Sequence, residues 1–250
     1  RQILIALPLH DDAGDGFLAQ GIASEQFADN NLELPADLYV LRPPVNDLDP
    51  AAKDLEGYLF PETYTLPRGT PVTKLVSLMV ERFRDTYMGL EAKRSGEVDL
   101  STRQIVTLAS LVEKETGKPE ERPLVAAVYW NRLNKKMAMQ ADPTVVYALV
   151  KAGTYDGNIR RRDLEFDSPY NTYRYPGLPP GPIASPGRAS LEAALVPASV
   201  EYLYFVSRND GSHAFAETLA KHNANVQEYQ VLYFRKQRAE RQRQQNGSTR

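Results

Sequence analysis

The segment 101–119 constrains the fold of this chain more than any other part of the sequence. Ser101 is followed three residues later by Gln104, the capping-box pattern that predicts the start of a helix. An apolar stripe at helical spacing comes next, and Gly117 with Pro119 supplies the stop signal. The stripe consists of Ile105, Leu108, Leu111 and Val112. A helix with such a face has to pack against other elements, so we expect it in the core.

Glu115 lies in an unusual sector of this predicted helix. At about 100° per residue it falls within about 20° of Leu108, in the middle of the apolar stripe, whereas Glu113 falls about 140° away. Periodicity leaves two interpretations of Glu115 open. It marks the frayed end of the helix and faces solvent, or it enters an apolar pocket, where desolvation would raise its pKa. A carboxyl kept protonated in this way could act as a general acid on a glycosidic oxygen. Glu113 is interpreted as a surface acid that pairs with Lys114 or Lys118.

Composition excludes several classes of protein. The chain has 250 residues, of which 42% are hydrophobic and 25% charged, values typical of a globular protein with a sizeable core. The net charge of −2 gives no electrostatic argument for nucleic acid or an anionic membrane. The absence of cysteine excludes disulfides, thiol nucleophiles and cysteine-bound metals. No stretch approaches the roughly 18 apolar residues of a membrane helix, and the start shows no signal-peptide pattern, so we interpret the chain as a fragment or a processed form.

The pattern along the chain predicts an α+β fold in three parts. Residues 1–54 are expected to form a small α+β piece that ends in a proline-rich linker. Residues 55–233 are expected to form a larger, mainly helical domain with short β-hairpins. The tail 234–250 is basic and glutamine-rich, and we expect it to fray into disorder. Within the large domain we predict helices over 70–90, 101–116 and 120–133, a short helix capped by Asp142, an ordered loop over 166–190, a hairpin across 209–211 and a final helix from about 217.

Five motifs follow one another between residues 55 and 230. They are Leu-Glu-Gly-Tyr-Leu-Phe-Pro-Glu-Thr-Tyr at 55–64; Leu-Ala-Ser-Leu-Val-Glu-Lys-Glu-Thr at 108–116; Gln-Ala-Asp-Pro-Thr-Val-Val-Tyr at 140–147; Ser-Pro-Tyr-Asn-Thr-Tyr at 168–173 with Gly-Leu-Pro-Pro-Gly-Pro-Ile-Ala-Ser-Pro-Gly at 177–187; and Tyr-Leu-Tyr-Phe-Val at 202–206, followed by His213, Phe215, His222 and Asn223. Each motif alone is weak. In this order and spacing they resemble the endolytic murein transglycosylases, the YceG-like family.

The resemblance implies a catalytic residue and a reaction. The catalytic acid is the second glutamate of Glu-Lys-Glu, which is Glu115, the residue that helical phase also selects. Such enzymes cleave the bond between N-acetylmuramic acid and N-acetylglucosamine without water. The muramoyl 6-hydroxyl attacks its own anomeric carbon and leaves an anhydromuramoyl end. Ordinary glycosidases use two carboxyl groups, but an intramolecular nucleophile makes one sufficient, because proximity supplies much of the work.

Five further residues are predicted to contact the substrate, each with an alternative role. They are Asn171, Tyr173, Gln140, Glu62 and Tyr170. Asn171 and Tyr173 could instead satisfy turn backbone, Tyr170 could pack, and Glu62 could pair with an arginine. Asp142 is explained as a helix cap, whereas Gln140 has no such structural explanation.

No metal or cofactor is expected. His213 and His222 lack a third histidine nearby and the His-Glu-x-x-His pattern, so we predict that they pack or hydrogen-bond to the site loops. The Gly-Leu-Pro-Pro-Gly run lacks the Gly-Lys-Ser/Thr ending of a phosphate loop. The run 160–162, three arginines, is interpreted as a solvated face, with contact to acidic stem peptides as the alternative.

The resemblance also implies partners and a location. Peptidoglycan strands would be the substrate and cell-wall synthases would be partners. The protein would lie at the periplasmic face of the inner membrane of a bacterium, held by an N-terminal anchor that this chain does not contain. Family members carry a small LysM-like subdomain, which residues 1–54 match only loosely.

Two other functions stay open at this point. The chain could be a silent peptidoglycan-binding or scaffold module, or a hydrolase with Glu62 or Asp142 as its second carboxylate. The products distinguish the three functions. Anhydromuramoyl ends indicate a transglycosylase, reducing muramic acid ends indicate a hydrolase, and intact strands indicate a scaffold.

Overall fold

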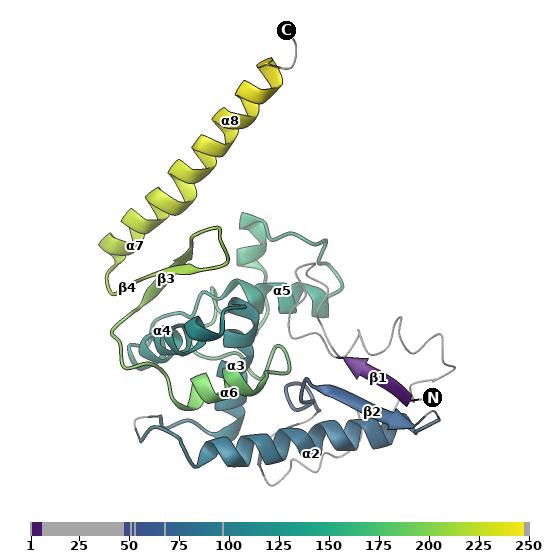
Figure 1. The fold of residues 1–250 in the computed structure, drawn as a ribbon. Helices are drawn as coiled ribbons and strands as arrows, with labels where there is room; N and C mark the ends of the chain where they lie inside the picture. The colour runs from purple at the N-terminus through teal and green to yellow at the C-terminus, as the bar shows by residue number, and fades with distance from the viewer. Residues whose placement is uncertain are drawn as a thin grey trace.

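A computed structural model describes residues 2–6 and 48–247, apart from positions 51, 53, 68 and 97 (Figure 1). The predicted α+β class is confirmed, with helices and two small antiparallel sheets. The helices are α2 (Val72–Glu91), α3 (Thr102–Glu115), α4 (Arg122–Asn134), α5 (Asp142–Lys151), α6 (Arg188–Leu195), α7 (Leu219–Val226) and α8 (Tyr233–Gly247). Short helical turns lie at η3 (Pro119–Glu121), η4 (Arg161–Glu165) and η5 (Gln227–Leu232), and the strands are β1 (Gln2–Ala6), β2 (Thr63–Pro67), β3 (Tyr204–Ser207) and β4 (His213–Ala216).

Helix α3 lies at the centre of the core. The predicted capping box is present, because the Ser101 side chain accepts from the Gln104 N–H and the Gln104 side chain accepts from the Ser101 N–H at 2.9 Å. All residues from Ile105 to Glu113 are buried, and the four residues of the predicted stripe have no exposed surface. A helix that is covered on every side sets the position of whatever stands at its end, and that residue is Glu115.

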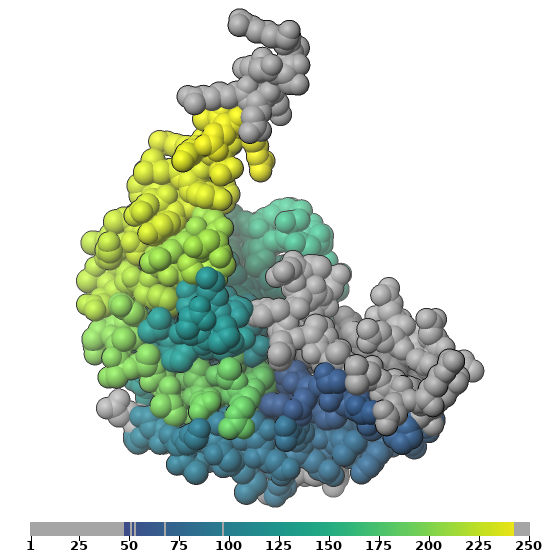
Figure 2. All heavy atoms as spheres, viewed as in Figure 1, coloured from purple at the N-terminus to yellow at the C-terminus, as the bar shows by residue number. Residues whose placement is uncertain are grey.

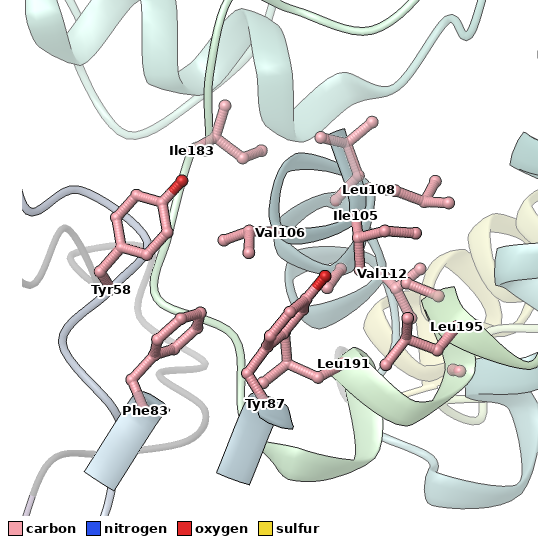
Figure 3. Close-up of a cluster of buried hydrophobic side chains, with 14 of the residues drawn as sticks. Tyr58, Phe83, Tyr87, Ile105, Val106, Leu108, Val112, Ile183, Leu191 and Leu195 are labelled. Atoms are coloured by element: carbon pink, nitrogen blue, oxygen red, sulfur yellow. The ribbon is translucent and has the colours of Figure 1, made fainter. Parts of the chain in front are cut away.

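Helices α4, α5 and α6 pack on α3, and side chains of α2 and of the loop before α6 join them in one core cluster, part of which Figure 3 shows. Phe83 of α2 meets Tyr58 edge to face, with 5.1 Å between ring centroids. Leu191 and Leu195 of α6 and Ile183 of the preceding loop belong to the same cluster. Helix α2 was predicted within two residues, whereas α6 was not predicted, because its eight residues follow a Pro/Gly-rich loop with no cap signal.

The small sheet at the N-terminus joins distant parts of the chain. Strand β1 pairs antiparallel with β2, so that Gln2 stands opposite Pro67 and Ala6 opposite Thr63. The prediction of a LysM-like piece over 1–54 concerns residues that lie almost entirely outside the described part.

The predicted hairpin is confirmed. Strands β3 and β4 pair from Tyr204–Ala216 to Ser207–His213. Helix α7 follows, and α8 continues as a rod that stands clear of the body of the protein (Figures 1 and 2). The predicted tail is therefore helical as far as Gly247. None of the described helices combines the length and the apolar character needed to cross a membrane.

Candidate active site

Glu115 is the last residue of α3, and its carboxyl lies against α4. The hydroxyl of Tyr129 donates to its Oε2 atom at 3.0 Å. Tyr129 is 1% exposed, whereas Glu115 keeps part of its surface accessible. Burial is the largest cause that raises the pKa of Glu115 from 4.5 to about 7. Glu115 therefore stands at the helix end and in a desolvating environment at once, which combines the two interpretations that periodicity left open.

Charges from three other elements act on this carboxyl. Asp142 at the start of α5 raises the pKa of Glu115, whereas His213 of β4 and Arg132 of α4 lower it. Groups on α4, α5 and β4 therefore act on one partly buried acid at the end of α3. A carboxyl whose pKa lies near neutral pH can both give and take a proton there.

Asp142 has a different role from the predicted one. The N-cap of α5 is Ala141, Asp142 is the first helical residue, and no side chain caps the helix, so the cap prediction was wrong. The carboxylate of Asp142 accepts instead from the Tyr173 hydroxyl at 2.5 Å. Burial and this bond raise the pKa of Tyr173, which keeps its hydroxyl protonated as a donor. Tyr173 is thereby held on the side of the site where Asp142 acts on Glu115.

Asn171 orders the loop that carries Tyr173. Its side chain is fully buried, and its amide donates to the carbonyl oxygens of Leu164 at 3.0 Å and Phe166 at 2.8 Å. Its Oδ1 atom accepts from the Tyr173 N–H at 3.0 Å. The side chain thus takes the structural role that the sequence left as its alternative, while a contact with substrate stays a prediction.

Gln140 lies beside this loop, directly before α5. It adopts a left-handed conformation with φ of 51°, and its N–H donates to the Thr172 carbonyl at 3.3 Å. Its side chain is exposed, so it is free to reach a ligand, and substrate contact stays a prediction. A left-handed non-glycine residue next to a site is often held there by function.

Tyr170 and Glu62 lie in other surroundings. The Tyr170 ring packs on Tyr147 with 4.7 Å between centroids, and the Lys151 ammonium lies 5.4 Å from each ring. Both carboxylate oxygens of Glu62 accept from Arg82, at 2.5 and 2.8 Å. Among the interactions of the described residues, none joins either side chain to Glu115. Their contact with substrate stays a prediction.

Glu113 is not the surface acid that helical phase predicted. It is 5% exposed, and its Oε2 atom accepts from the Gly187 N–H at 3.0 Å and from the Ser190 hydroxyl at 2.6 Å. The Arg122 guanidinium lies 3.7 Å from its other oxygen. The prediction failed because α6, which was not foreseen, packs on that side of α3. Glu113 is a structural acid that holds the start of α6.

Two residues around Glu115 were missed by the sequence analysis. Tyr129 and Arg132 stand three residues apart on α4 and face the site together. Arg132 is 9% exposed and donates to the carbonyl oxygens of Leu203 at 2.6 Å and Met139 at 2.7 Å, which fixes the segments before β3 and α5. The available signal was a tyrosine and an arginine three residues apart, directly after the apolar run 124–128.

The two histidines of the C-terminal motif have separate partners. His213 Nδ1 lies 2.7 Å from Glu121, and the His222 ring stacks on Tyr204 at 5.2 Å. Within the described part of the chain, no group of three or more His, Asp or Glu side chains is arranged to hold a metal ion.

Fold and site together define an α+β protein with a partly buried carboxyl of raised pKa at the end of a buried helix. Comparison with known proteins gives the family. The family model described as "YceG-like family" matches residues 16–228, so the chain belongs to the YceG-like family, as its motifs indicated.

Named relatives support the same assignment. The chain is 43% identical over 177 residues to the endolytic murein transglycosylase of Bacillus subtilis. The aligned region covers 70% of this chain and 48% of that protein. It is 36% identical over 181 residues to the endolytic murein transglycosylase of Streptococcus pneumoniae R6, covering 70% of this chain and 32% of that protein. The chain thus spans half or less of these relatives. A crystal structure of a YceG-like protein from Listeria monocytogenes matches with a TM-score of 0.61 and 39% identity, over 72% of this chain and 58% of that one.

Proposed function

We propose that this chain is the catalytic part of a lytic transglycosylase that cleaves peptidoglycan strands without water. The observation that carries the proposal is Glu115, whose pKa is raised to about 7 while a buried tyrosine donates to its carboxyl. At neutral pH such an acid is present in both protonation states. The relatives named endolytic murein transglycosylase support the same reaction.

In the proposed reaction one carboxyl moves two protons. Protonated Glu115 gives its proton to the oxygen that links muramic acid to the next sugar, and the bond from that oxygen to the anomeric carbon breaks. The muramoyl 6-hydroxyl forms the new bond to this carbon. Its proton passes to the Glu115 carboxylate, which restores the acid. The anhydromuramoyl end forms without added water, and the intramolecular nucleophile benefits from proximity.

In this proposal the neighbours of Glu115 set the balance between its protonated and its ionised form. The Tyr129 hydroxyl and the Arg132 and His213 charges stabilise the carboxylate that forms when the bond breaks. Asp142 and burial favour the protonated form that starts the reaction. Substrate contacts belong to the proposal as well: Tyr173 and Gln140 are best placed for them, and Asn171, Tyr170 and Glu62 are the remaining candidates.

The proposal extends to location and partners. A chain that cuts peptidoglycan works in the bacterial cell envelope. A membrane anchor elsewhere in the protein and an association with cell-wall synthases are further expectations, and they rest on family membership.

Digestion of purified peptidoglycan with mass analysis of the product ends tests the function. Wild type is expected to release anhydromuramoyl ends, and Glu115→Gln is expected to release none while keeping its fold and its binding to glycan. Glu113→Gln is the matched control on the same helix, and it should keep cleavage in whatever fraction stays folded. Normal turnover by Glu115→Gln, with activity lost in Glu113→Gln, would overturn the assignment.

A hydrolase is the second candidate, because Asp142 acts electrostatically on Glu115 and could serve as a second carboxylate. Reducing muramic acid ends that disappear in Asp142→Asn would favour it. Intact strands with retained binding would favour a scaffold module instead. The same digestion therefore distinguishes all three functions.

A further inference from the structure

Glu121 joins the end of α3 to the β3–β4 hairpin. Thr116 directly follows Glu115, and its hydroxyl donates to Glu121 Oε2 at 3.2 Å. The Thr116 hydroxyl in turn accepts from the Lys118 N–H at 3.1 Å. Glu121 is 7% exposed and Thr116 is 2% exposed, so these bonds form away from solvent. The chain just past Glu115 is thereby tied to one buried carboxylate.

The other side of this carboxylate holds His213. The His213 N–H donates to Glu121 Oε1 at 2.8 Å, and its Nδ1 atom lies 2.7 Å from Oε2. A carboxylate only accepts hydrogen bonds, so Nδ1 carries a proton and the ring orientation is fixed. Phe205 stands edge-on to the ring at 5.3 Å between centroids. The imidazole therefore has one defined position.

We propose that Glu121 and His213 form a positioning pair for Glu115. Glu121 holds the side chain of Thr116, the residue after Glu115, and the imidazole at the same time, so the carboxyl and the ring keep a fixed relation. His213 acts on the reaction through Glu115 and does not itself exchange a proton with the substrate. This role deepens the proposed function, in which the His213 charge acts on Glu115 but Glu121 has no part, and it rests on that function for its kinetic consequence alone.

A merely structural role for His213 would leave the electrostatics of Glu115 unchanged. Four groups face Glu115 from the elements packed against it: Tyr129 and Arg132 on α4, Asp142 on α5, and His213 on β4. Of these, His213 is the one that Glu121 holds in place, through its backbone N–H and its ring nitrogen. Loss of the ring should therefore raise the pKa of Glu115, since a nearby positive charge lowers it.

Carbon-detected NMR of carboxyl-labelled glutamate measures the pKa of Glu115 and does not depend on cleavage of a substrate. The Glu115 signal is assigned as the one that disappears in Glu115→Gln. His213→Gln is expected to raise the pKa of Glu115 by about half a unit or more, the effect of one charge removed at close range. Arg208→Gln is the matched control: it removes a positive charge from the same hairpin, where exposed Arg208 lies over the Tyr229 ring at 5.5 Å. An equal pKa of Glu115 in wild type and His213→Gln, or an equal rise in both variants, overturns the proposal.

A second measurement needs no variant and remains available if His213→Gln does not fold. In wild type, long-range proton–nitrogen NMR of labelled histidine should show a proton on His213 Nδ1, as the 2.7 Å contact with Glu121 requires. A His213 ring with no proton on Nδ1 contradicts the pair. In peptidoglycan digestion, His213→Gln should lower kcat about 10- to 100-fold with KM unchanged, and should move the alkaline limb to higher pH. If wild type does not cleave peptidoglycan but His213→Gln raises the pKa of Glu115, the proposed function alone is refuted. If wild type cleaves but the pKa of Glu115 does not change in His213→Gln, the positioning pair alone is refuted.

Discussion

Tyr129 and Glu115 connect the middle of α4 to the last residue of α3 through one hydrogen bond of 3.0 Å. The tyrosine has almost no exposed surface, so its hydroxyl cannot turn to solvent. Its bond favours the carboxylate form of Glu115, whereas burial favours the protonated form. The pKa of about 7 is the balance of these opposing effects, and single substitutions should move it in either direction.

Tyr129→Phe should move the pKa of Glu115 upward. The variant removes the donor and keeps the ring, so the carboxylate loses its partner and burial then dominates. Because the proposed reaction starts from protonated Glu115, the alkaline limb of kcat/KM should shift to higher pH, while kcat falls as the freed carboxyl loses its orientation. The pH–rate profile of peptidoglycan cleavage checks this. An alkaline limb that stays at the wild-type pH would show that the Tyr129 hydroxyl does not affect the pKa of Glu115.

Asp142→Asn should have the opposite sign. Asp142 raises the pKa of Glu115, and asparagine removes that negative charge while its oxygen still accepts from the Tyr173 hydroxyl. The alkaline limb should therefore shift to lower pH, by about half a unit for one charge that stays in contact with solvent. Combining Asp142→Asn with Tyr129→Phe should return the limb toward the wild-type position. A shift to higher pH in Asp142→Asn would contradict the charge arrangement.

Glu115→Gln should stabilise the protein at alkaline pH relative to wild type. The folded pKa of about 7 lies above the unfolded value near 4.5, so the folded state binds the extra proton. The contribution of Glu115 to the free energy of unfolding is therefore fully present below about pH 4.5 and is lost as the pH rises through about 7. Glutamine mimics the protonated acid and avoids this loss. Its gain should approach about 3 kcal/mol at most, and less in practice, because Glu115 keeps some contact with solvent.

Urea unfolding of both proteins at pH 4.5 and pH 8 measures the difference. Glu113→Gln is the control, since it breaks the bonds that Glu113 makes with Gly187 and Ser190 and should lower stability at both pH values. A difference between Glu115→Gln and wild type that does not change with pH would show that Glu115 is not desolvated in the folded protein.

The helices that the sequence predicted are those with local signals. Helix α3 was found because Ser101 and Gln104 form a capping box and because its stripe repeats at helical spacing. Helix α6 carries no such start and was missed, and the misassignment of Glu113 followed directly from it. Phase around one helix says which side a residue faces but not which neighbour covers that side.

The residues of the candidate site also divide into those with a local signal in the sequence and those without one. The partly buried position of Glu115 was predictable, because an acid on an apolar stripe is visible within one helix. Its catalytic role, which the family motif assigns to the same residue, stays a prediction. The contact of Glu121 with His213 joins residues 92 positions apart, and no periodicity connects them. The position of Asp142 directly before a proline fits a helix cap, so the sequence predicts that role. The hydrogen bond from Tyr173 depends on the loop that brings this residue to Asp142, and no local pattern indicates it.

Gly57 joins two of the five motifs by close packing. It adopts φ of +85°, in the left-handed region that favours glycine, and it is buried against the central loop. A Cβ atom at this position would lie 2.5 Å from two side-chain carbons of Pro182 and 3.1 Å from Val106. The proline ring is rigid, so it cannot move aside as a long side chain would.

Gly57→Ala should therefore destabilise the protein by about 2–5 kcal/mol, from the unfavourable φ and the overlap together. Gly69→Ala is the matched control, because Gly69 has φ of +84° with nothing within 4 Å of an added Cβ, and it should cost only about 1–2 kcal/mol. Urea unfolding measures the loss in free energy of unfolding for each variant, and the difference between the two losses gives the contribution of the steric overlap. Equal losses would mean that the 55–64 motif and the loop of Pro182 are not packed against each other as described. A larger loss at Gly57 supports the role of this contact in holding the loop that leads into α6 and, through Glu113, in fixing the end of α3.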